Sequence, residues 1–353
     1  MKTKSLDLLC ALSEFFCSYL ENVKGFSRNT VISYQYAFQM LFEYMNDVKN
    51  LPPEKVTFGS LTGGIIAEYL SWLEASRGCS AQTRNQRLAA MSSFAKYVMR
   101  KSFGGDSLVF CSEVANIPTK KVPKNTDVKY FTKEEISIIL SLPDTKREIG
   151  LRDVVLLSVL YSSGARAQEI CDLTLNDITF GTNTKLRLIG KGNKARNIVI
   201  PENCSKLLKG YIDRQFGNCT DNETRIRPVF SSQTHIKMSI SCIEAIVKKY
   251  VQQAKKEHPT LFKRSSYSPH SFRHSIAVHM LECGESLAVI RSFLGHESIS
   301  STMVYASVTP ELANRYLRER GRVLNSVELE VKGKSILSTL PFLNKVYSRG
   351  KGL

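Results

Sequence analysis

The chain has 353 residues, of which 42% are hydrophobic and 23% charged, and its 49 Lys plus Arg outnumber its 32 Asp plus Glu. This composition excludes a chain too polar to bury a sizeable core, and the length suggests about two domains. The formal net charge of +17 favours a polyanionic partner through counterion release and long-range attraction, although a merely basic soluble protein would carry the same charge.

Cysteine spacing and the apolar segments point to the cytoplasm. The nine cysteines are odd in number and form no CxxC pair, which is typical of reduced thiols in a cytosolic protein. The start MKTKSLDLLCALSEFF differs from a secretory leader, because Asp7 and Glu14 interrupt its apolar run and no small-residue cleavage site follows. The apolar stretch from Val154, VVLLSVLYSSGA, is shorter than the roughly 20 residues that span a bilayer. We therefore expect a cytoplasmic protein that enters no membrane.

Helical periodicity dominates residues 1–115, which we expect to form an all-helical first domain. Ser27 and Ser80 each precede a polar turn, in FSRNTVISY and CSAQTRNQRL, and serine is a favoured N-cap. A helix N-terminus with polar and basic side chains favours phosphate oxygens, although a solvated polar face is the alternative for each residue. We predict phosphate contacts from four residues in or beside these turns: Arg28, Asn29, Arg84 and Arg87.

Residues 116–131 break the helical pattern and are typical of a basic interdomain linker. The segment IPTKKVPKNTDVKYFT contains two prolines among several lysines. Lys120 and Lys121 would place positive charge on an extended strap, as expected if two domains close around a duplex. A solvated flexible linker is the alternative interpretation.

A capping box formed by Thr132 and Glu135 opens the second domain, which we assign to residues 132–320. Two β-branched runs around a glycine-bearing turn, LRLIGKGNKARNIVIP, predict a β-hairpin, and helical patterns return from Ser239. Residues 321–353 form a C-terminal tail. The predicted fold class is mainly α with a small β-sheet, a helical first domain preceding a mixed α+β domain.

Seven polar residues stand out against the apolar pattern of the second domain: Arg166, Glu169, Lys191, His270, Arg273, His296 and Tyr305. Taken singly, each has an ordinary explanation, such as a surface arginine, a soluble hairpin tip or a core tyrosine. Taken together, the set holds arginines, imidazoles and a downstream phenol. A phenol assisted by such groups can attack a phosphodiester without a metal ion.

His270 and Arg273 are predicted to project from one face of a helix that Pro269 can start, so that both can meet one phosphate. A zinc site is the rival interpretation, because His270 and His274 are four residues apart. No cysteine pair precedes them, and Ser271 stands where a metalloprotease would have its glutamate. We therefore expect no metal and no cofactor, and His274 is left to orient or to pack.

The end of the second domain is predicted to present two further residues. Gly295 ends an amphipathic segment in the manner of a C′ glycine, which exposes His296 just beyond the helix. Ser300 or Ser301 then caps a short segment that presents Tyr305.

The ordered set of motifs resembles the tyrosine recombinases of the phage integrase and Xer type. The resemblance depends on GARAQEICDL for the first arginine motif, GKGNKAR for the lysine hairpin, HSFRH, LGHESISST and the closing Tyr305. SRNTVISYQYAF and TRNQRLAAMSSFAKYV are similar to the helical, SAM-like core-binding domain of that family. The resemblance spans residues 10–320 and implies a C-shaped clamp, in which the two domains close on opposite sides of DNA.

The resemblance implies that Tyr305 is the nucleophile, which forms a 3′-phosphotyrosine link and releases a 5′-hydroxyl. Arg166 and Arg273 would hold the nonbridging oxygens, because planar guanidinium groups pair bidentately with phosphate and stay charged. Their stabilisation of the transition-state charge would be the largest contribution to catalysis.

The remaining roles follow from the same resemblance. Lys191 would protonate the leaving oxygen, His270 would assist proton transfer to or from the tyrosine, and His296 would hydrogen-bond the phosphate. Glu169 would orient an arginine.

The resemblance also implies the reaction and the partners. A homotetramer on two sites of double-stranded DNA would exchange strands through a Holliday junction, in the bacterial cytoplasm at the nucleoid; whether the free protein is a monomer stays open. We favour integration or excision of a mobile element, with Xer-type chromosome dimer resolution and DNA inversion as alternatives. A DNA-binding protein without catalysis and a type IB topoisomerase are less favoured. The tail 321–353 could regulate, contact an accessory partner or simply be loose.

Overall fold

The structure of the protein is a computed structural model that describes residues 2–101, 104–122, 128–217 and 222–306. The chain divides into two compact units, Met1–Lys124 and Asn125–Leu353. The division falls inside the segment 116–131, where the helical pattern of the sequence lapses.

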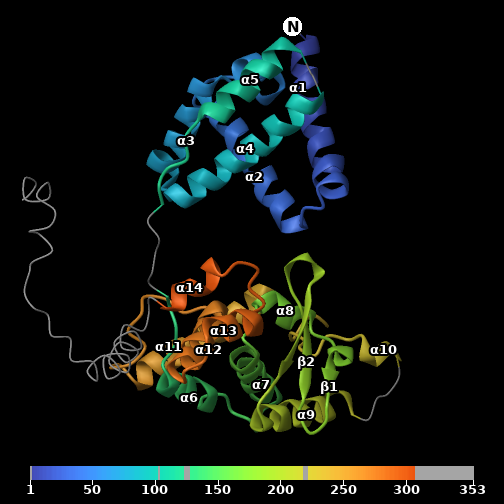
Figure 1. The fold of residues 1–353 in the computed structure, drawn as a ribbon, viewed down its shortest axis with the longest axis vertical. Coiled ribbons are helices and arrows are strands. Elements are labelled where there is room, and N and C mark those ends of the chain that lie inside the picture. Colours follow the sequence, from blue (N-terminus) through green and yellow to red (C-terminus); the bar gives the residue numbers. More distant parts are fainter. Residues whose placement is uncertain (1, 102–103, 123–127, 218–221, 307–353) are drawn as a thin grey trace, which may run out of the picture. The chain divides into compact units, whose positions relative to one another are not determined.

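The first unit is built from helices alone in its described part (Figure 1). Ser27 caps α2 by accepting a hydrogen bond from the backbone N of Thr30, and Ser80 accepts one from the backbone N of Thr83, as predicted. The helices are α1 (Lys2–Glu14), its π-helical continuation η1 (Phe15–Val23), α2 (Arg28–Asp47), η2 (Pro53–Lys55), η3 (Phe58–Ser60), α3 (Gly63–Arg77), α4 (Ala81–Lys101) and α5 (Gly105–Asn116).

Aromatic packing around α4 forms the core of the first unit. The ring of Phe94 contacts four phenylalanine rings of other elements at centroid distances of 5.2 to 6.2 Å, those of Phe15, Phe38, Phe58 and Phe110. Three of the four contacts are edge-to-face, the geometry that aromatic quadrupoles favour. Each partner comes from a different element, so α4 holds the unit together.

The second unit combines helices with a small sheet. Thr132 forms the predicted capping box with Glu135 at the start of its first helix. Its elements are α6 (Lys133–Ser141), α7 (Glu148–Ser163), α8 (Ala167–Asp172), η4 (Leu175–Asp177), β1 (Ile178–Thr179), β2 (Lys185–Ile189), η5 (Lys191–Asn193), β3 (Ala195–Val199), α9 (Glu202–Phe216), α10 (Asn222–Arg225), α11 (Ile240–Glu257), α12 (Pro269–Glu282), α13 (Leu287–Leu294) and α14 (Ser300–Ala306).

The three strands form an antiparallel sheet in the order β1-β2-β3. Leu186 pairs with Ile198, and both side chains are buried, so one face of the hairpin joins the core. The turn between β2 and β3 holds Gly192 at φ 73° and Asn193 at φ 57°, the left-handed backbone that a tight hairpin turn needs. The predicted hairpin and the predicted fold class, mainly α with a small sheet, are confirmed.

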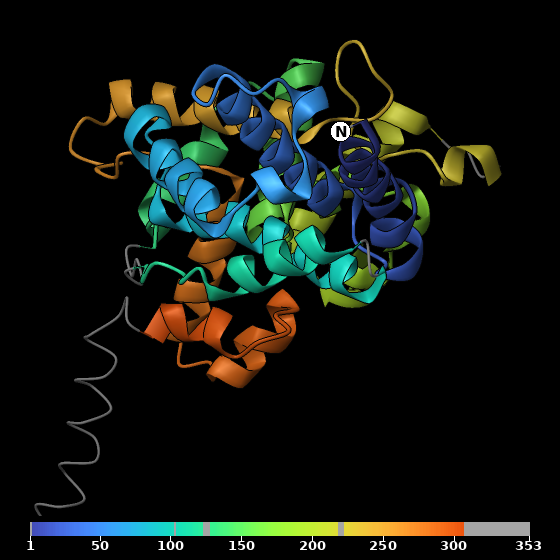
Figure 2. The same cartoon turned by 90° about the horizontal axis from the view of Figure 1, so that it is seen from above.

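Helix α7 carries the apolar stretch from Val154 and is the buried centre of the second unit. Val155, Leu156 and Leu157 are fully buried, and the helix packs against α9 and α12. This segment is therefore a core helix, as its length predicted. In both views α12, α13 and α14, drawn in orange, form one compact group (Figure 1, Figure 2).

Several expectations concern the whole chain. The eight cysteines in the described part are all free thiols. Within the same residues, no helix is both long and apolar enough to cross a membrane. The predicted tail 321–353 and the segment of the second domain after Ala306 lie outside the described residues.

Candidate active site

Arg273 is fixed between the ends of two helices. Its side chain is buried, with Nη1 donating to the carbonyl oxygen of Gly164 at 2.6 Å and Nη2 to that of Leu294 at 2.8 Å. Gly164 caps the C-terminus of α7 and Leu294 ends α13, so the cation lies where helix dipoles favour positive charge. Burial, with the nearby charge of Arg166, lowers the pKa of Arg273 to about 10. The guanidinium therefore stays charged at neutral pH.

Arg166 is held by Glu169, three residues along the same turn. The backbone N of Arg166 donates to Oε2 of Glu169 at 2.8 Å, and Nη1 donates to Oε1 at 2.8 Å. Glu169 is buried, with 4% of its surface exposed, whereas the Arg166 side chain keeps 32% exposed. The carboxylate thus fixes the arginine while leaving part of the guanidinium open to a ligand.

Arg196 of β3 binds the same carboxylate and was assigned no role from the sequence. Its Nη1 and Nη2 lie 2.9 and 2.8 Å from Oε1 and Oε2 of Glu169, and its Nε donates to the carbonyl of Phe293 at 3.2 Å. Burial raises the pKa of Glu169, but the hydrogen bonds and charges of Arg196 and Arg166 outweigh it, so the pKa is lowered overall. Glu169 is an anion between two cations, and Arg196 joins the hairpin to the end of α13.

Two glycines permit these close contacts. A Cβ on Gly295 would lie 3.0 Å from Cδ of Arg196, and a Cβ on Gly190 would lie 3.1 Å from Oε1 of Glu169. Gly295 also has φ 65° as the C-cap of α13, as the sequence predicted. The glycines of the LGH and GKG motifs therefore have a packing role beside their backbone role.

Tyr305 is covered by the protein. Its residue is 1% exposed and packs in a cluster with Val278, Ile290 and Leu294. The hydroxyl is hydrogen-bonded to Nδ1 of His274 at 3.0 Å. Burial raises the pKa of Tyr305 to about 12, although the charges of Arg273 and Arg166 act against this shift. The expectation that α14 presents this tyrosine is wrong for the structure described, because the ring packs in the core and its hydroxyl is hydrogen-bonded to His274.

Three imidazoles surround the tyrosine and the arginines. Burial lowers the pKa values of both His274 and His296 to about 4, helped by neighbouring positive groups. The pKa of His270 is also lowered, by desolvation and then by Arg273 and Arg166, although His270 is exposed at the first turn of α12. All three rings are thus neutral at neutral pH and can accept or donate a hydrogen bond.

His296 is tied to the helix that carries the tyrosine. Its Nδ1 is hydrogen-bonded to Oγ1 of Thr302 at 3.0 Å, and its ring lies nearly parallel to that of Tyr305, with centroids 6.4 Å apart. Thr302 is fully buried, one turn before Tyr305. Sequence reasoning gave no role to Thr302, since a threonine in a polar turn carries no distinctive signal.

Lys191 begins the hairpin turn η5, and its side chain lies outside what the structure describes. The turn is joined to the loop after α13 by an ion pair, Lys194 with Glu297 at 2.7 Å. A cavity of about 540 Å³ lies beside this loop, and Arg166, Arg196 and His296 line it. Its cationic lining suits a phosphate group.

The first unit places two predicted phosphate contacts at its surface. Arg28 and Asn29 are exposed in the first turn of α2. Arg84 is buried, and its Nη1 donates to the carbonyl of Pro118 at 2.8 Å. The prediction for Arg84 is corrected, because this guanidinium holds the chain that follows α5 instead of facing solvent.

Arg87 is also engaged within the first unit. Its Nη1 donates to the carbonyl of Ser33 at 3.1 Å, and its guanidinium lies 4.7 Å from the centroid of the Tyr36 ring. These contacts join α4 to α2, although the side chain stays partly exposed.

The predicted strap begins as an ordered segment. Asn85 Nδ2 donates to the carbonyl of Lys120 at 2.7 Å, and the ammonium of Lys120 pairs with Glu74 at 2.6 Å. Lys121 follows as an exposed residue. The strap therefore packs along α4 as far as Lys120.

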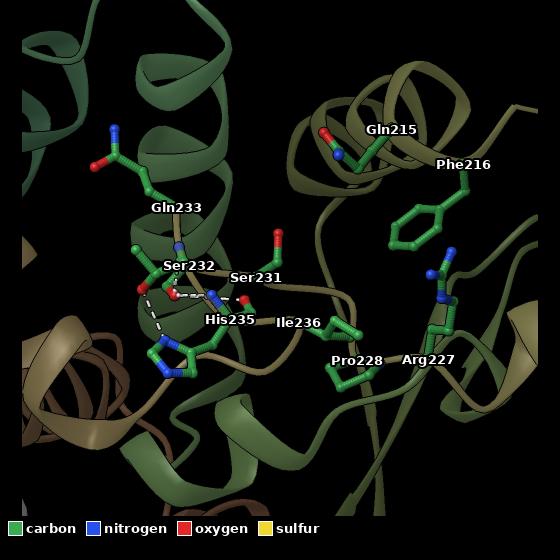
Figure 3. A pocket seen from close by; sticks show the side chains of 10 residues that line it. Gln215, Phe216, Arg227, Pro228, Ser231, Ser232, Gln233, His235 and Ile236 are labelled. Atoms are coloured by element: carbon green, nitrogen blue, oxygen red, sulfur yellow. Dashed lines mark hydrogen bonds between the residues drawn. The ribbon is translucent and has the colours of Figure 1, made fainter.

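A separate cavity of about 350 Å³ lies at the end of α9 (Figure 3). Phe216 and Arg227 line one side, and a turn organised by the Ser232 hydroxyl lines the other. This hydroxyl accepts a hydrogen bond from the backbone N of His235 at 2.9 Å. The predicted catalytic residues do not line this cavity.

Sequence comparison finds relatives along most of the chain. The profile of the Phage integrase family matches residues 129–311, and that of the phage integrase N-terminal SAM-like domain matches residues 14–102. A putative integrase/recombinase of Sinorhizobium fredii is 30% identical over 308 residues, 87% of this chain and 90% of the relative. A tyrosine recombinase XerC of Myxococcus xanthus is 31% identical over 305 residues, 86% of this chain and 95% of the relative.

Solved structures share the fold. The XerH site-specific recombinase bound to a palindromic difH substrate, a post-cleavage complex, aligns with a TM-score of 0.63 at 17% identity, covering 90% of this chain and 91% of that one. The Tn1549 transposon integrase in complex with circular intermediate DNA aligns with a TM-score of 0.59 at 15% identity, covering 83% and 94%. Because the family profile spans more than half of the residues and two relatives of 30% and 31% identity align over 87% and 86% of the chain, the chain belongs to the phage integrase family of tyrosine recombinases.

Proposed function

We propose that this tyrosine recombinase cleaves and rejoins double-stranded DNA at a specific site, through a covalent link between Tyr305 and a 3′ phosphate. The observation that carries the proposal is the convergence of two guanidinium charges on one phenol. His296, whose ring lies parallel to that of Tyr305 at a centroid distance of 6.4 Å, lines one cavity with Arg166. Arg273 is bonded to Leu294, which packs in the same cluster as Tyr305. Two fixed cations beside a hydroxyl nucleophile are what charge development on a phosphoryl group requires.

In the proposed reaction, the oxygen of Tyr305 forms a bond to phosphorus while the bond to the 5′ oxygen breaks. Arg166 and Arg273 hold the nonbridging oxygens, and His296 donates a hydrogen bond to one of them. Its Nδ1 is taken by Thr302, which leaves Nε2 for the phosphate. Lys191 gives a proton to the 5′ oxygen from the hairpin turn, and His270 assists transfer of the phenolic proton.

No energy source is needed for religation, because the phosphotyrosine bond conserves the energy of the phosphodiester. The 5′-hydroxyl of a second strand attacks the same phosphorus, and the same groups act in reverse. Glu169 serves as a positioning residue for Arg166. We assign residues 132–320 to the catalytic domain and residues 1–115 to the core-binding domain that closes on the opposite side of the DNA.

The relatives support both the partner and the kind of reaction. The XerH structure contains a palindromic difH substrate, and the Tn1549 integrase structure contains circular intermediate DNA. We propose that four copies of this chain act on two duplexes and exchange strands through a Holliday junction, with residues 321–353 available to an accessory partner. One relative is named an integrase/recombinase and several are named XerC, so mobile-element integration and chromosome dimer resolution are both supported.

Trapping of covalent adducts in cells tests the proposal and recovers the target sequence at the same time. The tagged protein is expressed in cells, adducts are precipitated with SDS, and the covalently attached DNA is sequenced. We expect adducts at one or a few sequences, and none with Tyr305→Phe. Sites at the ends of a mobile element indicate an integrase, whereas a single chromosomal site near the replication terminus indicates dimer resolution.

A matched control separates chemistry from folding. Tyr161→Phe removes the hydroxyl of a half-buried tyrosine of the same unit, one bonded to His279 at 2.9 Å, and should leave adduct formation intact. If the wild-type chain forms no adduct in cells or on its recovered sites, or if the Tyr305→Phe adduct equals that of wild type, the proposal fails.

A further inference from the structure

The nucleophile proposed above is held between two histidines. The Tyr305 hydroxyl lies 3.0 Å from Nδ1 of His274, and the two rings have centroids 5.7 Å apart. On the other side, the ring of His296 is almost parallel to the phenol, at an interplanar angle of 10°. The two histidines come from α12 and from the loop after α13, so they reach α14 from different elements.

The hydrogen bond to His274 is made between neutral groups. The lowered pKa of about 4, caused by burial and by His270 and Arg273, keeps the ring neutral at neutral pH. A neutral imidazole carries one lone pair on a ring nitrogen, and the tyrosine is protonated because its own pKa is raised. The bond therefore joins two uncharged groups, and the imidazole has a hydrogen-bonding nitrogen for the phenol in either tautomer.

The covered position of Tyr305 is incompatible with attack. Bond formation needs the phenolic oxygen and the phosphorus about 3 to 3.5 Å apart in line. With the residue 1% exposed and Arg273 3% exposed, a phosphodiester with its flanking sugars has no path to the hydroxyl. The phenol must therefore leave its place beside His274 before strand cleavage.

Hydrogen bonds and apolar packing hold α14 (Ser300–Ala306) beside the site. The hydrogen bonds include the one between Tyr305 and His274 and the one between Thr302 and His296. A hydrogen bond of this kind shifts an equilibrium by about fivefold.

We infer that His274 is a positioning residue for the nucleophile, whose imidazole holds the Tyr305 hydroxyl in a covered resting position until DNA is bound. This inference rests on the proposed role of Tyr305. It gives a function to a histidine that the catalytic set does not use and that sequence reasoning left to orient or to pack.

Nitration by tetranitromethane tests the inference on the full-length protein without DNA. The extent of reaction at Tyr305 is read by mass spectrometry of its peptide, with the exposed Tyr36 as the internal reference. His274→Asn keeps a hydrogen-bond acceptor at the place of Nδ1. His274→Leu introduces a side chain of nearly the same shape as asparagine that has no acceptor. His274→Phe, which keeps the ring, is the second variant without an acceptor.

We expect wild type and His274→Asn to protect Tyr305, and His274→Leu or His274→Phe to raise its nitration about fivefold, the factor for one lost hydrogen bond. His279→Leu is the matched control, because His279 of the same helix is hydrogen-bonded to the hydroxyl of Tyr161 at 2.9 Å. It should raise nitration at Tyr161 alone. A cooperative thermal transition checks the folding of each variant. If only one of the Leu and Phe variants folds, that variant alone is enough for the test.

Two outcomes overturn the inference. The first is nitration of Tyr305 in wild type as fast as that of Tyr36, and the second is equal nitration in the Asn and Leu variants. Either result can occur while covalent DNA adducts still depend on Tyr305, so loss of this inference is distinguishable from loss of the proposed function.

Discussion

Arg196 grips the Glu169 carboxylate with two parallel hydrogen bonds of 2.9 and 2.8 Å. Arg166 donates to the same two oxygens from the start of α8. The buried Glu169 carboxylate thus sets the distance between the hairpin and the start of α8, where Arg166 is proposed to bind phosphate. Bidentate pairs of this kind fix geometry as well as charge.

Arg196→Met should destabilise the second unit by about 2 to 3 kcal/mol. The buried Glu169 carboxylate loses the two charged donors of Arg196 and keeps only the hydrogen bonds from Arg166. Urea unfolding followed by circular dichroism measures the loss. Arg187→Met is the control, since that side chain is 58% exposed and lies 3.8 Å from Asp177. It should change the unfolding free energy by less than about 0.5 kcal/mol. Equal effects of the two changes would contradict the structural role given to Arg196.

The pH dependence of stability should report on Glu169. Its pKa is lowered in the folded protein below the ordinary 4.5. The folded state therefore binds the proton less readily than the unfolded state, so the stabilisation is complete above 4.5 and is lost as the pH falls through the folded pKa. Glu169→Gln should flatten the dependence of the unfolding free energy in this acidic window. An unchanged slope in the variant would assign the acid sensitivity to other carboxylates.

Two adjacent lysines should differ in their contribution to DNA binding. Lys121 is exposed, whereas the ammonium of Lys120 pairs with Glu74. Lys121→Ala should lower the slope of log Kd against log salt by about 1 on a duplex of arbitrary sequence, and Lys120→Ala should lower it less. Fluorescence anisotropy over a salt series measures both slopes. If neither variant changes the slope, the segment does not contact phosphate.

Gly164→Ala should cost more than a change at another left-handed glycine. A Cβ at Gly164 would lie 2.9 Å from Cδ2 of Leu294, whereas one at Gly192 meets nothing within 4 Å. Both residues have positive φ, at 57° and 73°. Gly192→Ala should cost about 1 kcal/mol for backbone strain alone, and Gly164→Ala about 1 to 3 kcal/mol more for overpacking. Thermal and urea unfolding measure the difference. Equal losses of unfolding free energy in the two variants would show that the Leu294 side chain at the end of α13 moves aside at no cost.

Local chemistry made much of the fold predictable. The serine caps of the first unit, the Thr132 capping box, the hairpin turn and the C-cap at Gly295 each depend on a few neighbouring residues, and the structure has all of them. The order of the motifs along the chain also identified the family.

The destinations of long side chains could not be predicted in the same way. Arg84 lies in a polar first turn but turns inward to the Pro118 carbonyl, a partner 34 residues away. Arg196 and His274 acquire their roles from groups 27 and 31 residues away. Contacts at such separations are set by tertiary packing, which periodicity and spacing do not encode.

The ion pair between Lys194 and Glu297 has a practical consequence for kinetic work. Both side chains are largely exposed, at 71% and 64%, so the attraction that links the turn bearing Lys191 to the loop bearing His296 is screened by added salt. Added salt will weaken this tether, whereas the buried contacts of Arg196 with Glu169 and Phe293 still hold the hairpin. The rate of the proton transfer proposed for Lys191 should therefore depend on ionic strength.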